Sequence, residues 1–439
     1  MSLFFIKGSQ LLLSLSILIV LHELGHFIPA KLFKTRVEKF YLFFDIKFSL
    51  FKKKIGETEY GIGWLPLGGY VKIAGMIDES MDTEHLNKDP EPWEFRSKPT
   101  WQRLIIMLGG VTVNLILGFL IYMMVAFIWG KTIITNEDLP GGYEVAEIMK
   151  PYGFKDGDKI LEVNGNDLEN IADISKYLFL RNVSSVKVEH FDGKNEILTI
   201  PENIGVQMFE TGNMLPFTAL VQPIIDSIEP NSPAQKANLI SEDLILSVNG
   251  TSIIKWQDFT KLVKESSSKS VVLDVKRKGR VISKTISLRD DNTIGVGLKI
   301  PVITPTQLSF TMSESISRGY QKAYWTLLDY VSQFKYVFSK KGASQLGGFA
   351  SIGGLFPPTW DWRGFWESTA LISIILAFMN LLPIPALDGG HVMFLLYELV
   401  SGRKPNDKFM EYAQVFGFFL LMSLVLYANG NDVYRAIFG

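Results

Sequence analysis

A histidine pair with an adjacent glutamate interrupts an apolar stretch near the start of the chain. His22, Glu23 and His26 form the pattern HExxH within LSILIVLHELGHFIPAKLF, residues 15–33. On a helix, residues four apart share one face, so both imidazoles can reach one metal ion while the glutamate approaches a metal-bound water. Zn²⁺ matches best, because it accepts neutral imidazole and keeps one position open in catalytic sites. The pattern therefore predicts a catalytic zinc site.

A catalytic zinc normally has three protein ligands, so another donor is required. Of the other histidines, His85 and His190 fall in segments expected to be aqueous and on opposite sides of a membrane. Asp388 and His391 occur in NLLPIPALDGGH, residues 380–391. Broken helix at membrane depth is tolerated only beside a buried site or a watery cavity, so both stay open as the third ligand. Four residues are expected to break the helix here: Pro383, Pro385, Gly389 and Gly390.

Four apolar stretches are long enough to hold these groups in membrane-spanning helices. Lys and Arg near the span ends gather after the first and third stretches, and basic loops stay cytoplasmic. Both termini and the segment of about 131–365 are then expected outside the cytoplasm. The four stretches are residues 6–33, 104–129, 367–398 and 410–429.

The large outer segment contains an internal repeat. DGDKILEVNGNDLENIADISKYL (156–178) is matched by SEDLILSVNGTSIIKWQDFTKLV (241–263). Each copy has a short β-branched strand, an Asn-Gly turn and a helix with an apolar face. Two copies of this size predict a tandem of small domains.

Composition excludes several other classes of function. The chain has 44 basic and 45 acidic residues, so no strong field favours nucleic acid. It has no cysteine, which excludes disulfides, thiolate metal sites and a cysteine nucleophile. Hydrophobic residues make up 47% of the 439 residues, which is compatible with a chain lying partly in a bilayer.

These motifs together resemble a known family. HELGHF in the first span and NLLPIPALDGG in the third resemble the intramembrane site-2 proteases, and the two VNG repeats resemble the tandem PDZ domains of their bacterial branch. The resemblance implies a polytopic α-helical membrane protein with four transmembrane helices, inserted β-rich tandem PDZ domains and a membrane-re-entrant β-hairpin loop. It also implies a zinc metalloendopeptidase with one Zn²⁺ per chain.

The resemblance assigns roles to individual positions. It implies that His22, His26 and Asp388 are the zinc ligands, with Glu23 as the general base and His391 as a bystander. Asn380 matches an asparagine that helps hold the substrate backbone near the metal.

Two glycine-rich segments have matches in the same family. GIGWLPLGGYVKIAGM (61–76) matches the re-entrant loop, whose open edge would take an extended substrate as an added strand. Gly68, Gly69 and Tyr70 are the expected substrate-binding residues there. QLGGFASIGGLF (345–356) resembles a segment written LSGPIGI in the family, but it lacks the proline.

The expected organisation follows from the charge distribution of the loops, and the expected partners follow from the family resemblance. Substrates would be single-pass membrane proteins resembling anti-sigma factors, and remnant signal peptides are also considered. The protein would lie in the bacterial inner membrane, with termini and PDZ domains periplasmic and residues 35–100 and 401–409 cytoplasmic. The expected regions are 1–34 (first span, HExxH), 35–100 (cytoplasmic and re-entrant β-loop), 101–130 (second span), 131–215 and 216–300 (PDZ domains), 301–366 (amphipathic periplasmic linker), 367–400 (third span, LDG), 401–409 (cytoplasmic loop) and 410–439 (fourth span).

Other readings stay open. A non-enzymatic membrane adaptor would use the PDZ pair for its partners and the metal for structure, yet structural zinc sites have four protein ligands. A metal transporter would carry more acidic and histidine residues along several spans. The PDZ pair itself either binds carboxyl termini or acts as a filter that excludes bulky substrates.

Overall fold

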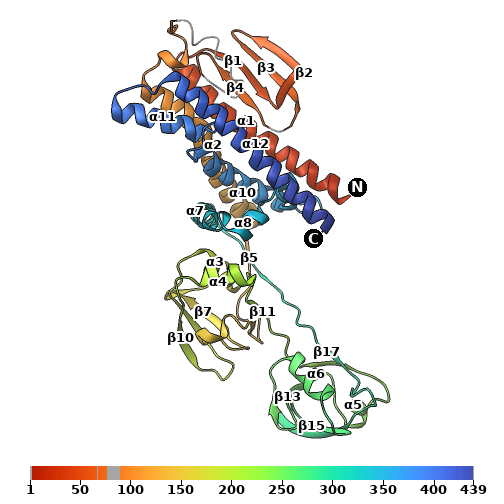
Figure 1. The fold of residues 1–439 in the computed structure, drawn as a ribbon. Coiled ribbons are helices and arrows are strands. Elements are labelled where there is room, and N and C mark those ends of the chain that lie inside the picture. Colours follow the sequence, from red (N-terminus) through yellow and green to blue (C-terminus); the bar gives the residue numbers. More distant parts are fainter. Residues whose placement is uncertain (1, 67, 77–88, 439) are drawn as a thin grey trace. The chain divides into compact units, whose positions relative to one another are not determined.

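The computed structural model describes residues 2–66, 68–76 and 89–438, and the chain divides into two compact units (Figure 1). The first unit combines Met1–Gly130 with Ser309–Gly439, and the second comprises Lys131–Leu308. His85, which was considered as a metal ligand, lies outside the described residues.

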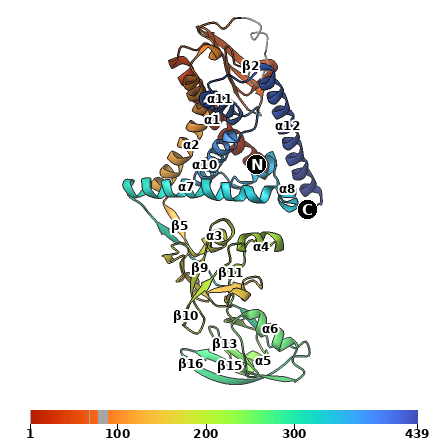
Figure 2. The same ribbon diagram turned by 60° about the vertical axis from the view of Figure 1, so that its left-hand side comes forward.

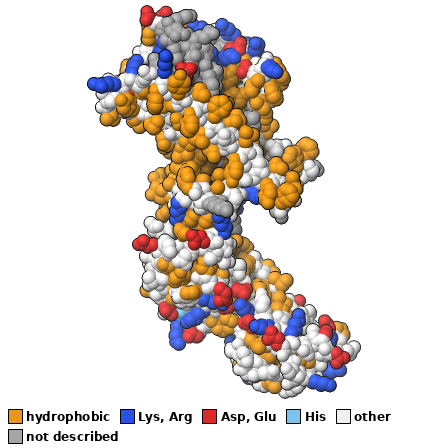
Figure 3. Space-filling view, viewed as in Figure 1, with side chains coloured by type: hydrophobic (Ala, Val, Ile, Leu, Met, Phe, Trp, Pro, Cys, Tyr) orange, Lys and Arg blue, Asp and Glu red, His pale blue; other side chains and the backbone are white. Residues whose placement is uncertain are grey.

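The first unit is a helical bundle with a small sheet. The prediction of four apolar helices is confirmed, because four helices in the described residues are long and apolar enough to cross a membrane. Figure 3 shows hydrophobic side chains over much of the visible face of this unit, as expected for helices that contact lipid. The four are α1 (Leu3–Leu32), α2 (Thr100–Trp129), α10 (Trp362–Leu381) and α12 (Asp407–Phe438).

The third apolar stretch is two helices with a break between them. Helix α10 ends at Leu381, and α11 (Asp388–Ser401) begins after the break. Pro383 and Pro385 lie in the break, because proline lacks a backbone N–H and its ring collides with the preceding turn.

The expectation that Gly389 and Gly390 also break the helix is wrong. Both lie in the first turn of α11. A Cβ on Gly389 would lie 2.2 Å from the carbonyl oxygen of Leu382, and one on Gly390 would lie 2.6 Å from that of Ile384. Their role is to let α11 pack against the backbone of the break.

Helix α2 is the centre of the bundle, since it packs against α1, α10, α11 and α7 (Met312–Val337). Helix α7 begins at a capping box formed by Thr311 and Glu314 and crosses one end of the bundle (Figure 2). It meets α2 through small residues, and a Cβ on Gly319 would lie 2.4 Å from the Cα of Met123.

The apolar stripe of α7 is largely exposed, although the ring of Tyr320 also packs edge-on against Phe119 of α2. Met312, Ile316 and Tyr320 are 62%, 48% and 52% exposed. The stripe suits a helix lying along a membrane surface.

A four-stranded sheet follows α1, in the order β2-β3-β1-β4. The hairpin expected within residues 61–76 is wrong as a topology, because β3 and β4 do not pair with each other and β1 lies between them. Strand β1 is parallel to β3 and antiparallel to β4, which leaves β4 at one end of the sheet. The strands are β1 (Val37–Leu42), β2 (Phe44–Ile55), β3 (Thr58–Leu65) and β4 (Tyr70–Ile73).

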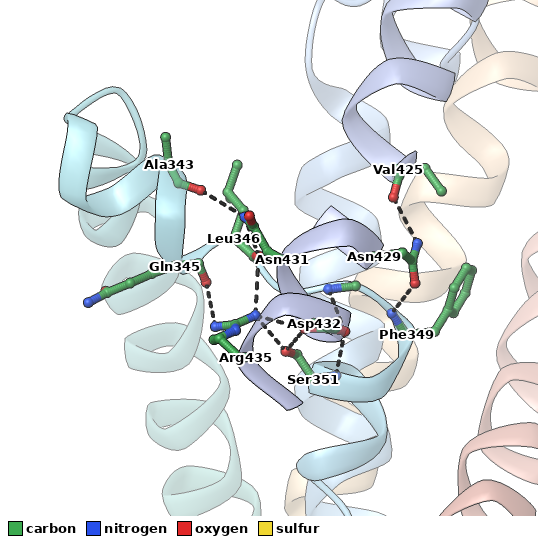
Figure 4. A network of polar contacts seen from close by, with 11 residues as sticks. Ala343, Gln345, Leu346, Phe349, Ser351, Val425, Asn429, Asn431, Asp432 and Arg435 are labelled. Carbon is green, nitrogen blue, oxygen red and sulfur yellow. Dashed lines mark hydrogen bonds and ion pairs between the residues drawn. The ribbon is translucent and has the colours of Figure 1, made fainter. Parts of the chain in front are cut away.

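The C-terminal end of α12 is tied to the segment QLGGFASIGGLF by polar contacts (Figure 4). The Asp432 carboxylate accepts hydrogen bonds from the backbone N–H groups of Gly348 and Ser351, at 2.9 and 3.0 Å, and from the Ser351 hydroxyl. Arg435 pairs with the same carboxylate and donates to the carbonyl of Leu346. The N-cap residue of α9 (Phe349–Gly354) is a glycine, which has no side chain to cap the helix, so Asp432 provides the cap instead. Helix α8 (Lys340–Gln345) precedes α9 in the chain.

In the second unit the two copies of the repeat have the same topology, with strand orders β10-β9-β7-β8 and β14-β13-β15-β16. Both Asn-Gly turns occur as predicted, with positive φ at Asn164, Gly165, Asn249 and Gly250, which a tight hairpin turn requires. Copy one contains β7 (Lys159–Val163), β8 (Asn166–Asp167), α3 (Ile174–Leu180), β9 (Ser185–Glu189) and β10 (Asn195–Thr199). Copy two contains β13 (Leu244–Val248), β14 (Thr251–Ser252), α6 (Trp256–Lys264), β15 (Ser270–Arg277) and β16 (Arg280–Ser287).

Each copy has a separate hydrophobic core and short flanking elements. Copy one is extended by the pair β6–β11 and copy two by the pair β12–β17, while β5 pairs with β18. These elements are β5 (Lys131–Ile133), β6 (Tyr143–Val145), α4 (Ile204–Thr211), β11 (Phe217–Ala219), β12 (Ile225–Ile228), α5 (Pro233–Lys236), β17 (Val296–Leu298) and β18 (Thr306–Leu308).

An aspartate at the same repeat position is fully buried in each copy, but its partner differs. Asp158 contacts His190 Nδ1 at 2.7 Å, and Asp243 accepts two hydrogen bonds from Arg277. Burial alone lowers the pKa of the His190 imidazole, but hydrogen bonds to Asp158 and Glu196 outweigh burial and the pKa is raised above 6.5. Copy one therefore depends on a histidine whose protonation strengthens the pair, whereas copy two depends on an arginine.

Candidate active site

The two histidines of HExxH lie on one face of α1, as their spacing predicts. Their Nε2 atoms are 3.3 Å apart, and both rings face α2. Helix α2 comes this close because glycines line the contact. A Cβ on Gly25 would lie 2.5 Å from the carbonyl oxygen of Gly109, and one on Gly110 would lie 2.3 Å from His26 Nε2.

Asp388 reaches the same point from the first residue of α11. Its Oδ2 atom lies 3.3 Å from His22 Nε2 and 3.4 Å from His26 Nε2. The preceding break is held in an unusual conformation, since Ala386 has φ of 78° and its N–H donates to Gln414 of α12. A left-handed alanine costs about 1–2 kcal/mol, so the conformation that orients Asp388 toward the histidines is slightly destabilising.

The spacing of these three atoms fits a tetrahedral zinc ion. Bonds of about 2.05 Å at the tetrahedral angle separate two ligand atoms by about 3.3 Å. The three separations in the structure are 3.3, 3.3 and 3.4 Å. Among the described residues no fourth histidine, cysteine or acid joins the group, so a tetrahedral ion here would keep one position for water or substrate.

Further polar atoms contact the histidine rings. His26 Nδ1 lies 2.8 Å from the carbonyl oxygen of Ile106, and His22 Nδ1 lies 3.2 Å from the side-chain amide of Asn114. Asn380, at the end of α10, has its amide nitrogen 3.4 Å from His22 Nε2. Asn380 therefore lies beside His22 at the edge of α10 that faces the group.

The segment that contains Gly68, Gly69 and Tyr70 borders Glu23. A Cβ on Gly69 would lie 2.5 Å from Ile19 Cγ2 and 3.6 Å from Glu23 Cγ, so only glycine lets this backbone pass. Tyr70 instead donates its hydroxyl to Asp45 at 2.8 Å, and burial together with this carboxylate raises its pKa. The backbone at the start of β4, rather than the Tyr70 hydroxyl, borders the glutamate.

Comparison with known proteins agrees with this geometry. The sequence profile described as peptidase family M50 matches residues 10–424. The chain belongs to peptidase family M50.

Individual relatives extend over nearly the whole chain. A regulator of sigma E protease from Haemophilus influenzae is 27% identical, covering 97% of this chain and 98% of the relative. Its counterpart in Escherichia coli is 26% identical with the same coverage of both chains. A protein of Neisseria meningitidis, named a candidate zinc metalloprotease, is 29% identical over 96% of this chain and 97% of its own. The M50 chain is accordingly a metalloprotease.

The remaining described histidines lie apart from the candidate zinc site of this M50 protease. His391 lines a separate pocket with Arg103, Glu398 and Lys404, and it is not part of the three-residue group. His190 lies in copy one of the second unit, against Asp158.

Two residues that contact the candidate zinc ligands were not predicted from the sequence. Gly110 and Asn114 both lie on α2 and contact the histidine rings. A signal existed for Asn114, because it is a polar amide within an apolar span and such residues are usually functional or pair helices. Gly110 had no comparable signal, since its role depends on how closely α2 approaches α1.

Proposed function

We propose that this M50 protease hydrolyses a peptide bond within or near the cytoplasmic end of the transmembrane segment of single-pass membrane proteins. His22, His26 and Asp388 would hold one Zn²⁺, and Glu23 would be the general base. The observation that carries the proposal is the convergence of three ligand atoms at 3.3 to 3.4 Å from α1 and α11, beside the glutamate of HExxH. Zinc bound there would polarise the scissile carbonyl and lower the pKa of a coordinated water.

Glu23 provides the proton transfers in this proposal. It lies next to His22 in sequence and beside the backbone of Gly69. Its carboxylate takes the proton of the attacking water and then delivers it to the leaving amine. Asn380 offers its amide to the substrate backbone at the same place, because that amide lies 3.4 Å from His22 Nε2.

Strand β4 supports a specific way of binding the substrate. A helical substrate hides its carbonyls in hydrogen bonds, so it must unwind before cleavage. Strand β4 is at the end of its sheet and begins beside Glu23, so an unwound segment can add to it as a further strand. Gly68 and Gly69 let the backbone before β4 pass close to Phe44 and Ile19. Together with Tyr70 they are the proposed contacts of that substrate segment.

The proposed location is the bacterial inner membrane, with both termini and the second unit periplasmic. The four apolar helices and the basic loops support this orientation. The two copies of the repeat are proposed to be PDZ domains, which either bind carboxyl termini or exclude bulky substrates. Since two relatives are named regulators of sigma E protease, anti-sigma-factor-like proteins are the proposed substrates.

The test is cleavage of a single-pass reporter by the purified chain in detergent, with zinc content measured on the same sample. Glu23→Gln should bind zinc normally and lose at least about 100-fold of the cleavage rate, the range of general-base catalysis. His22→Ala should lose both zinc and activity. Cleavage by Glu23→Gln at the parental rate would refute the mechanism. Capture of stabilised membrane fragments in cells carrying Glu23→Gln would then identify substrates.

The adaptor hypothesis makes the opposite prediction. A structural zinc site has four protein ligands, and only three converge among the described residues. If the parent binds zinc but cleaves no reporter, and partner binding needs only the second unit, the adaptor hypothesis replaces the protease.

A further inference from the structure

The two candidate zinc histidines differ in what their second ring nitrogen contacts. His26 Nδ1 faces the backbone carbonyl of Ile106 at 2.8 Å, which can only accept a hydrogen bond. His22 Nδ1 faces the side-chain amide of Asn114 at 3.2 Å, which can accept or donate according to its rotation. The proton on His26 is therefore fixed by the backbone, whereas that on His22 depends on one side chain.

Zinc binding requires one particular tautomer of each ring. A neutral imidazole that gives the Nε2 lone pair to a metal carries its proton on Nδ1. That proton needs an acceptor, and among the described residues the only hydrogen-bonding side chain at His22 Nδ1 is Asn114. The Asn114 carbonyl oxygen Oδ1 must then face the ring.

The structure places the amide the other way round, with Nδ2 toward His22 and Oδ1 buried without a partner. The oxygen and the NH₂ group of an amide are nearly equal in size, so both orientations fit the same space. A half-turn of the amide breaks no hydrogen bond except the one to His22, because Oδ1 has none to lose. The side chain is 1% exposed, so water does not compete for the site.

The Asn114 backbone is held while its amide can turn. Its carbonyl oxygen accepts a hydrogen bond from the buried Ser373 hydroxyl of α10 at 2.6 Å. This contact ties α2 to α10 at the level of the histidines. The backbone of Asn114 is therefore held in place, while its side-chain amide can rotate to hydrogen-bond either tautomer of His22.

We propose that Asn114 is a positioning residue that selects the zinc-binding tautomer of His22 by accepting its Nδ1 proton. With the amide reversed, His22 carries its proton on Nε2 and donates it toward Asp388, a state without metal. With Oδ1 facing the ring, Nε2 is a free lone pair. Partners of this kind around metal-bound histidines typically contribute 10- to 100-fold in metal affinity. The inference rests on the zinc site of the proposed function.

The test compares two variants of nearly equal size with opposite hydrogen-bonding capacity. The carboxylate of Asn114→Asp can only accept a hydrogen bond from His22, whereas the side chain of Asn114→Leu can neither accept nor donate one. Zinc affinity of the full chain in detergent is measured by competition with a chelator, and the Co²⁺-loaded protein is followed by its visible absorption. Asn114→Leu should bind zinc at least 10-fold more weakly. Asn114→Asp should bind within about threefold of the parent or more tightly, with the parental tetrahedral Co²⁺ spectrum.

Controls separate this role from a structural one. Ser373→Ala removes the hydrogen bond to the Asn114 backbone but leaves its amide, so zinc affinity should stay within about threefold. Melting temperatures of the metal-free variants report folding, and Asn114→Ala replaces Asn114→Leu if leucine does not fold. The inference is overturned if Asn114→Asp loses as much affinity as Asn114→Leu, or if neither loses any. Failure of the parent itself to bind zinc would instead refute the proposed function.

Discussion

Gly110→Ala tests whether the proposed zinc site depends on the close approach of α2 to the two histidines. Gly110 faces both histidine rings, and a Cβ there would lie 2.3 Å from His26 Nε2 and 2.6 Å from His22 Cε1. Ordinary contacts with a carbon atom are about 3.5 Å or longer. One added methyl group therefore requires the rings or α2 to withdraw by about 1 Å.

The expected loss follows from the tolerance of metal coordination. Metal–ligand distances must stay within about 0.2 Å of their ideal values, so a displacement of about 1 Å removes a ligand. We expect zinc affinity to fall by at least about 100-fold, which corresponds to about 2.8 kcal/mol. Alanine is the better helix former by about 1 kcal/mol, so the effect cannot come from a weaker α2.

The assay is a zinc titration against a chelator, with the melting temperature of the metal-free protein measured in parallel. The matched control is Gly8→Ala on α1, where an added Cβ meets no atom within 4 Å. That variant should bind zinc as the parent does. Parental zinc affinity and cleavage in Gly110→Ala would refute the proposed contact between α2 and the histidines.

Three further predictions concern other parts of the chain. His391→Ala should keep zinc and cleavage within about twofold, because His391 lies outside the ligand group; loss of zinc would make it a ligand. The raised pKa of His190 means that its stabilisation is complete below about pH 6.5 and is lost as pH rises through the folded pKa. As pH rises, amide-exchange protection, corrected for intrinsic rates, should then fall in β7 and β9 of copy one but not in copy two, where Arg277 holds the aspartate. An equal fall in both copies would contradict this. Asp432→Ala removes the acceptor of the Gly348 and Ser351 N–H groups. The end of α12 should then exchange faster, by the roughly 0.5–2 kcal/mol of local stability that a helix cap contributes, and unchanged exchange would contradict this.

Local motifs were the part of the site that could be predicted. His22 and His26 share a face because helical geometry alone places residues four apart together. The Asn-Gly turns of both repeat copies were predictable for a similar reason, since few residues tolerate positive φ at both central positions of a tight hairpin.

Errors arose where pairing is not local. Residues 61–76 do contain the end of β3 and all of β4, but β1, from an earlier part of the chain, lies between them in the sheet. No pattern within residues 61–76 predicts that a distant strand separates the two. Gly389 and Gly390 were expected to break a helix because glycine is a poor helix former. In the structure they instead permit α11 to pack against the break that the prolines make.

The sequence by itself determined the chemistry: two imidazoles and a carboxylate base at helical spacing, four apolar helices, and a repeated β-rich segment. Between Asp388 and His391 it did not decide on physical grounds, and only the resemblance to a family favoured the aspartate. The tertiary structure brings Asp388 to 3.3 Å from His22 and leaves His391 in another pocket. It also identifies Gly110 and Asn114, because α2 lies against the histidines of α1 only in the folded chain. There, Gly110 leaves room for the two rings, and Asn114 places an amide next to His22 Nδ1.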